Sequence, residues 1–141
     1  MLVTILAGVL VYVFSQLFDE YILKPIHKYT MLKSKIASTL AYYAMEYWNP
    51  IFLTENNTEK RLNSYQTASE EVRKTAAELK GFIEERPFLA FTLPSSKKLI
   101  DAYRGLTGLS NSFFVGSQAD WQEHTKAYEL GVYDALKLKQ K

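Results

Sequence analysis

Two histidines, His27 and His124, are the residues whose type first suggests acid–base or metal chemistry. Asp120 precedes His124 by four residues, so a helix would place both side chains on one face. There the carboxylate can orient the imidazole for proton transfer, or the two side chains can share a metal ion. A structural contact between the two residues explains the same spacing. We favour the structural contact, because no second histidine or further carboxylate stands at ligand spacing.

Motifs of the common enzyme classes are missing from the sequence. It contains no His-Glu-x-x-His or His-x-Glu motif, no P-loop, no glycine-rich dinucleotide fingerprint and no arginine–histidine pair of the helical ribonuclease type. Cysteine is absent, which excludes disulfides, thiolate metal sites and cysteine nucleophiles. We therefore expect a protein that is not an enzyme, with no catalytic residue, no cofactor and no metal ion.

The segment 106–114 is rich in small and hydroxylated residues. Gly105 and Gly108 each weaken a helix by about 1 kcal/mol, so another interaction must compensate. One interpretation is a nucleotide or nucleic-acid surface with basic phosphate contacts, an amide hydrogen bond and an aromatic ring that stacks on a base. Its candidate residues are Lys97, Lys98, Arg104, Asn111 and Phe113. The other interpretation, which we favour, is close helix packing through the glycines.

Apolar residues recur at three- and four-residue steps along most of the chain, which predicts an all-α fold. The expected helices after the first cover residues 26–47, about 58–83, 96–113 and 117–138. Ser95 or Ser96 would cap the helix over 96–113, and Ser117 with Asp120 would open the last helix. No strand pattern competes. We expect these segments to form a bundle of about four helices.

The first eighteen residues contain no charged side chain. As a helix they would reach about 27 Å, close to the roughly 30 Å hydrocarbon core of a bilayer. We therefore expect a transmembrane anchor over residues 1–24 and a helical domain over 25–141. Pro25 predicts a kink or break near residue 24. A cleaved signal peptide and a buried helix of a soluble assembly are the alternatives.

The charges beside this run predict the topology of the anchor. No lysine or arginine precedes it, whereas Lys24, Lys28, Lys33 and Lys35 follow it. Lysine enriched at one end of a span marks the cytoplasmic side. We therefore expect a single-pass protein of the cell inner membrane with its N-terminus outside and its helical domain in the cytoplasm. The net charge of +2 is too small to indicate nucleic-acid binding by itself.

Small and polar residues share one face of the expected anchor. On a helical wheel they fall within about 80° of one another. They are Thr4, Gly8, Tyr12, Ser15 and Asp19. In lipid such a face favours close helix–helix approach, and several copies around an axis would line a water-filled path. Chance alignment is the alternative.

Several stretches together resemble a group of small bacterial membrane proteins. They are the uncharged head and residues 21–28, 36–44 with the following Asn49-Pro50, and 106–112. The architecture is also similar to that of membrane effectors in antiphage defence, including effectors of the Hailong kind that are paired with a nucleotidyltransferase. The resemblance implies a cytoplasmic part that oligomerises, an anchor that perturbs the membrane and gating by a nucleic-acid product. It assigns no site residue.

The leading hypothesis is therefore a homo-oligomeric inner-membrane effector that forms a channel or depolarises the membrane. Its partners would be the lipid bilayer, further copies of the chain and a nucleotide or nucleic-acid signal. The alternative is a non-catalytic accessory or anchoring subunit of a larger membrane complex. A third hypothesis is a membrane-tethered nucleotide or nucleic-acid binder.

Overall fold

The computed structural model describes residues 2–52, 58–86, 92–115 and 121–138. Within these residues the fold is all-α, as predicted, apart from two strands of two residues each. The elements in chain order are α1 (Leu2–Phe18), the π-helical turn η1 (Asp19–Leu23), α2 (Lys24–Tyr42), α3 (Ala44–Trp48), β1 (Ile51–Phe52), α4 (Glu59–Glu85), α5 (Ser96–Asn111), β2 (Phe114–Val115) and α6 (Trp121–Leu136).

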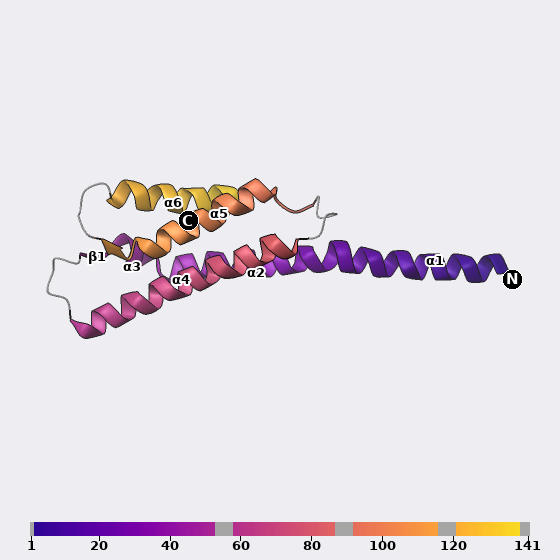
Figure 1. The fold of residues 1–141 in the computed structure, drawn as a ribbon, viewed down its shortest axis with the longest axis horizontal. Helices are drawn as coiled ribbons and strands as arrows, with labels where there is room; N and C mark the ends of the chain where they lie inside the picture. Colours follow the sequence, from indigo (N-terminus) through magenta and orange to yellow (C-terminus); the bar gives the residue numbers. More distant parts are fainter. Residues whose placement is uncertain (1, 53–57, 87–91, 116–120, 139–141) are drawn as a thin grey trace.

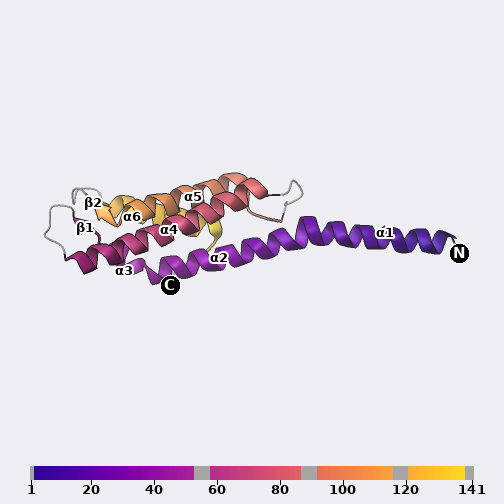
Figure 2. The same ribbon diagram turned by 60° about the horizontal axis from the view of Figure 1, so that its bottom comes forward.

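The elements α1, η1 and α2 form one uninterrupted helical rod, and α1 projects from the rest of the molecule without a neighbour (Figures 1 and 2). Of the kink or break expected near residue 24, the break is wrong, because Leu23 and Lys24 both keep helical dihedral angles. A proline ring clashes with the carbonyl four residues earlier, which here belongs to Tyr21 inside η1. In this wider turn the Lys24 N–H donates to the Asp19 carbonyl, so the helix accommodates Pro25 without ending.

Four helices, α2, α4, α5 and α6, run alternately in opposite directions and form the bundle (Figures 1 and 2). α5 packs between α4 and α6, and α2 packs on α4. The core takes one stripe from each helix, as the periodicity predicts. Its fully buried large side chains include Ile36 and Leu40 of α2, Val72 and Leu79 of α4, Leu99, Leu106 and Leu109 of α5, and Val132 and Leu136 of α6.

A short parallel pairing closes the bundle end farthest from α1. β1 pairs with β2 in the register Ile51↔Phe114 and Phe52↔Val115. The Ile51 N–H also donates to the Phe113 carbonyl at 3.0 Å. The prediction that no strand forms is wrong here, because two residues are too few for a visible alternation in the sequence. The pairing fixes the connection after α3 against the end of α5.

Two helices differ from their expected form. The helix expected over 26–47 ends at Tyr42, and after Tyr43 leaves the helical region the chain resumes as α3. Along α6 the three- and four-residue steps predict a buried stripe of Trp121, His124, Tyr128, Val132, Ala135 and Leu138. The stripe is buried at Trp121, Val132 and Ala135 and half-buried at Leu138, whereas His124 and Tyr128 are exposed. Thr125 and Leu136 are buried instead, together with Trp121, Val132 and Ala135. The expected capping pair of this helix, Ser117 and Asp120, lies outside the described residues.

Candidate functional site: an exposed apolar helix

The side chains described along α1 are exposed, and most of them are apolar. The exposed fraction is 69% for Phe14, 67% for Val11 and 52% for Phe18. Within the described residues, Val3–Tyr42 is the one helical segment long and apolar enough to cross a membrane, and none of its apolar window is buried in the protein. Full burial of one such side chain gains about 1.5–3 kcal/mol. The exposed apolar side chains of α1 forgo this gain within the fold of the single chain.

The predicted polar face of α1 is also exposed. The side chains of Thr4, Tyr12 and Ser15 are exposed, and a Cβ atom added at Gly8 would meet nothing within 4 Å. Asp19, at the start of η1, is half-buried, and its carboxylate lies 3.8 Å from the Lys24 ammonium. Along α1 this face is uncovered, whereas at its Asp19 end the carboxylate is engaged by Lys24.

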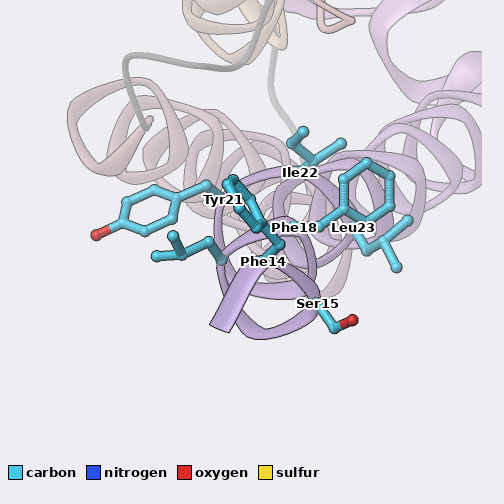
Figure 3. A pocket seen from close by; sticks show the side chains of 7 residues that line it. Phe14, Ser15, Phe18, Tyr21, Ile22 and Leu23 are labelled. Atoms are coloured by element: carbon cyan, nitrogen blue, oxygen red, sulfur yellow. The ribbon is translucent and has the colours of Figure 1, made fainter. Parts of the chain in front are cut away.

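An open hollow of about 700 Å³ surrounds the junction of α1 and η1. Its lining residues all come from the rod itself: Phe14, Ser15, Leu17, Phe18, Tyr21, Ile22 and Leu23. Figure 3 shows their side chains spread outward around one helix. The hollow is therefore a surface of the rod, which acyl chains or a second helix can fill.

Charged side chains begin where the apolar surface of the rod ends. Lys24 pairs with Glu20 on the rod, and Lys28 pairs with Glu85 at the end of α4. About two turns further along α2, Lys35 contacts Glu78 of α4 at 2.6 Å. The two cross-helix pairs join α2 to α4. Exposed ion pairs contribute little stability, so their main consequence is the position of charge at this boundary.

The glycines of α5 serve helix packing, as the favoured interpretation of the segment 106–114 predicts. That interpretation also placed the asparagine and serines inside the bundle, which is right for Ser110 and Ser112 and wrong for Asn111. A Cβ atom at Gly105 would lie 2.6 Å from Cγ2 of Val132 and 2.9 Å from the Tyr128 carbonyl oxygen. One at Gly108 would lie 2.6 Å from the Tyr128 ring. On the opposite side of α5, the Ser69 hydroxyl donates to the Ser110 carbonyl at 2.7 Å. Small residues thus bring α5 close to both neighbours.

The proposed nucleic-acid residues do not form one site. Phe113 is fully buried, with its ring centroid 6.2 Å from that of Tyr47, so this ring is not available to stack on a base. Asn111 is exposed, and its amide oxygen accepts a hydrogen bond of 2.9 Å from Arg73. Lys97, Lys98 and Arg104 are exposed on α5. Lys97 and Asn111 stand at opposite ends of this helix, about 21 Å apart at 1.5 Å per residue.

The histidines show no catalytic arrangement in the part of the chain that the structure describes. His27 and His124 are both exposed, and the His124 ring stacks 6.5 Å from the Tyr128 ring. Asp120 lies outside the described residues, so its predicted contact with His124 stays a prediction. Among the described residues, no three histidine, aspartate or glutamate side chains gather as a metal site would require.

Comparison with protein-family models, curated proteins and solved structures finds no match to this chain. The resemblance to bacterial membrane effectors therefore stays a prediction, and the functional argument depends on the geometry of the rod and the bundle.

Proposed function

We propose that this chain is a single-pass membrane protein that inserts α1 in the bilayer and holds its helical bundle at the cytoplasmic surface. The observation that carries the proposal is the exposure of the apolar side chains along α1. Ten large aliphatic or phenylalanine side chains of this helix are exposed: Val3, Ile5, Leu6, Val9, Leu10, Val11, Val13, Phe14, Leu17 and Phe18. Their transfer from water to lipid is worth on the order of 10 kcal/mol.

The boundary between apolar and charged surface supports the position of the membrane. α1 is about 26 Å long at 1.5 Å per residue, slightly less than the roughly 30 Å hydrocarbon core. Beyond the charged Asp19 and Glu20, the apolar residues Tyr21, Ile22 and Leu23 of η1 extend this length. Tyr21 suits the interface, and the long stem of Lys24 lets its ammonium reach the headgroups. The lysines that follow favour a cytoplasmic bundle.

We further propose that copies of the chain associate through the face formed by Thr4, Gly8, Tyr12 and Ser15. Gly8 lets two helices approach closely, and the hydroxyls supply hydrogen bonds that lipid does not offer. This association would assemble a homo-oligomeric effector in which the gathered anchors conduct ions or depolarise the membrane. Antiphage defence and gating by a nucleotide or nucleic-acid signal are the roles that the resemblance implies.

Three measurements on the full-length chain test these statements in order. Resistance to carbonate extraction tests insertion, and release of the chain into the soluble fraction would contradict it. Light scattering in mild detergent tests association, for which we expect a single oligomer rather than a monomer. A monomer that copurifies with unlike subunits would support the accessory-subunit alternative. Finally, a membrane-potential dye tests conduction, and an unchanged potential under the activating signal would exclude a channel.

A further inference from the structure

A cavity of about 380 Å³ lies at the bundle end nearest α1. It is bounded by the first turns of α2, the start of α5 and the end of α6. Its described lining residues are Tyr29, Lys33, Thr92, Leu93, Pro94, Ser95, Lys98, Ala135, Leu136 and Lys137. Segments distant in the sequence therefore converge here.

The charge of this cavity is one-sided. Lys33, Lys98 and Lys137 come from three different helices or helix ends, and no acidic residue stands among the described residues that line the cavity. Five lysines outside the cavity are paired with carboxylates: Lys24, Lys28, Lys35, Lys74 and Lys80. None of the three cavity lysines forms an ion pair with a carboxylate in the described part of the chain. Three uncompensated cations around one cavity attract an anion.

The backbone holds two of these lysines together. Lys137 has φ 51°, the left-handed conformation that glycine usually supplies at a helix C-terminus. The Lys137 N–H donates to the Asp134 carbonyl at 3.4 Å, and the Leu138 N–H donates to the Tyr133 carbonyl at 2.9 Å. These two bonds form a Schellman cap on α6. The Lys137 carbonyl then accepts a hydrogen bond of 3.2 Å from the Lys33 ammonium.

The rest of the lining supplies polar groups and an apolar wall. Ser95 is the N-cap of α5, and its hydroxyl accepts from the Lys98 N–H at 3.4 Å, so the positive end of the α5 dipole adds to the field. Leu93 and Leu136 are buried, and Tyr29 is half-buried beside them. A ligand with both a charged and an apolar part would match these two kinds of surface.

We propose that this cavity, defined by Lys33, Lys98 and Lys137, binds the phosphate group of a small ligand whose organic part lies against Tyr29, Leu93 and Leu136. A lipid headgroup and a soluble phosphate ester both carry this chemistry. Tyr29 and Lys33 lie about 8 and 14 Å along the rod from Lys24, so either source can reach the cavity. The role of this cavity as the signal input of a membrane effector rests on the proposed function. Phosphate binding by the cavity does not rest on it.

The test is calorimetric titration of the full-length protein in detergent micelles with inorganic pyrophosphate. The site variant is Lys33→Gln/Lys98→Gln/Lys137→Gln. The matched control is Lys60→Gln/Lys97→Gln/Lys126→Gln, which removes the same charge at three exposed lysines that do not line the cavity. We expect salt-dependent binding, weakened about tenfold or more in the site variant and by less than about threefold in the control.

Absence of binding to the wild-type protein, or an equal loss in both triple variants, would overturn the proposal. If the site variant unfolds, Lys98→Gln alone serves, because the structure gives the Lys98 ammonium no hydrogen bond to lose, and it is compared with Lys97→Gln. Mass spectrometry of copurified phosphatidylglycerol then distinguishes the sources. If the site variant copurifies with less phosphatidylglycerol than the control variant, the ligand is a lipid headgroup. If both variants carry equal lipid and only the site variant loses pyrophosphate binding, the ligand is a soluble phosphate ester.

This test separates the proposals. Pyrophosphate binding in micelles does not require α1 to span a bilayer, and carbonate extraction does not require the cavity. A protein that binds pyrophosphate but is released by carbonate would retain the phosphate site and lose the proposed function. A protein that resists carbonate extraction but does not bind pyrophosphate would support membrane insertion and overturn the phosphate site.

Discussion

The Tyr47 hydroxyl in α3 donates a hydrogen bond of 2.7 Å to Oε1 of Glu129 in α6. Tyr47 is fully buried, and its ring also packs against Phe113. Burial and the Glu129 carboxylate together raise the pKa of Tyr47 far above its ordinary value. The bond therefore ties the short helix α3 to the last helix through a phenol that stays protonated.

The first prediction concerns the loss of this bond. Tyr47→Phe keeps the ring but leaves the half-buried Glu129 carboxylate without its donor, so we expect the free energy of unfolding to fall by about 1–3 kcal/mol. Tyr42→Phe is the matched control, because the Tyr42 side chain is 76% exposed. Urea unfolding followed by circular dichroism measures both variants. Equal stability of the two would show that the bond contributes nothing.

A second prediction follows from the raised pKa of Tyr47. An unfolded tyrosine loses its proton near pH 10, whereas folded Tyr47 holds its proton, so the folded state binds more protons above that pH. The stability contribution is thus complete below about pH 10 and is lost as the pH rises further. Tyr29, Tyr43 and Tyr133 also have raised pKa values, caused first by burial, and act in the same direction.

We therefore expect the melting temperature of the wild-type protein to fall above about pH 10, and that of Tyr47→Phe to fall less steeply. The three other tyrosines keep a residual slope in the variant. Thermal unfolding between neutral and alkaline pH gives both curves. Parallel curves for the two proteins would contradict the assignment of the slope to Tyr47.

The third prediction uses the contrast between two glycines. A Cβ atom at Gly105 would lie 2.9 Å from the backbone oxygen of Tyr128, whereas one at Gly81 would meet nothing within 4 Å. Gly105→Ala should therefore destabilise the bundle by about 1–3 kcal/mol, because α5 and α6 must move apart. Gly81→Ala should stabilise it by about 0.5–1 kcal/mol through helix propensity alone. Chemical denaturation that shows the same sign for both would refute the close approach of α5 and α6.

The helical elements were predictable because their signals are local. The stripe of α2, including Leu32, Ile36 and Leu40, is buried as expected, and Ser95 caps α5 as expected. The pairing of β1 with β2 depends instead on a contact between Ile51 and Phe114, which no local pattern shows. The burial of Phe113 also depends on residues distant in the sequence, because its ring packs against Tyr47 of α3 and Tyr65 of α4.

The cavity defined by Lys33, Lys98 and Lys137 could not be predicted from local sequence patterns either. The sequence marks Lys98 as a candidate ligand residue and Lys33 as one of the lysines that predict membrane topology, but no local pattern connects either of them with Lys137. Their convergence depends on the antiparallel order of the bundle, which brings the start of α2 and the end of α6 together (Figure 1). A one-sided charge can be recognised only after the fold shows which lysines have carboxylate partners.

The fourth prediction separates stability from binding at Lys137. A non-glycine residue in the left-handed conformation costs about 1 kcal/mol, so Lys137→Gly should raise the free energy of unfolding by about that amount. The same substitution removes a cation from the cavity, so pyrophosphate binding should weaken. The control is Lys126→Gly, which removes a charge from α6 outside the cavity. A glycine inside the helix should lower stability. Tighter pyrophosphate binding by Lys137→Gly would contradict the assignment.

The fifth prediction concerns the anchor, and the absence of cysteine makes it direct. A single Gly8→Cys places a thiol on the face with Thr4, Tyr12 and Ser15, whereas Leu10→Cys places one about 200° around the helix at nearly the same depth. Both side chains lie at exposed positions of α1. If copies associate through the polar face, mild oxidation in membranes should cross-link Gly8→Cys rapidly and Leu10→Cys slowly, because a disulfide needs Cα atoms within about 7 Å. Denaturing electrophoresis of the two time courses measures the difference. Equal rates would mean that the anchors collide without a preferred face, and faster cross-linking of Leu10→Cys would place the contact on the opposite side.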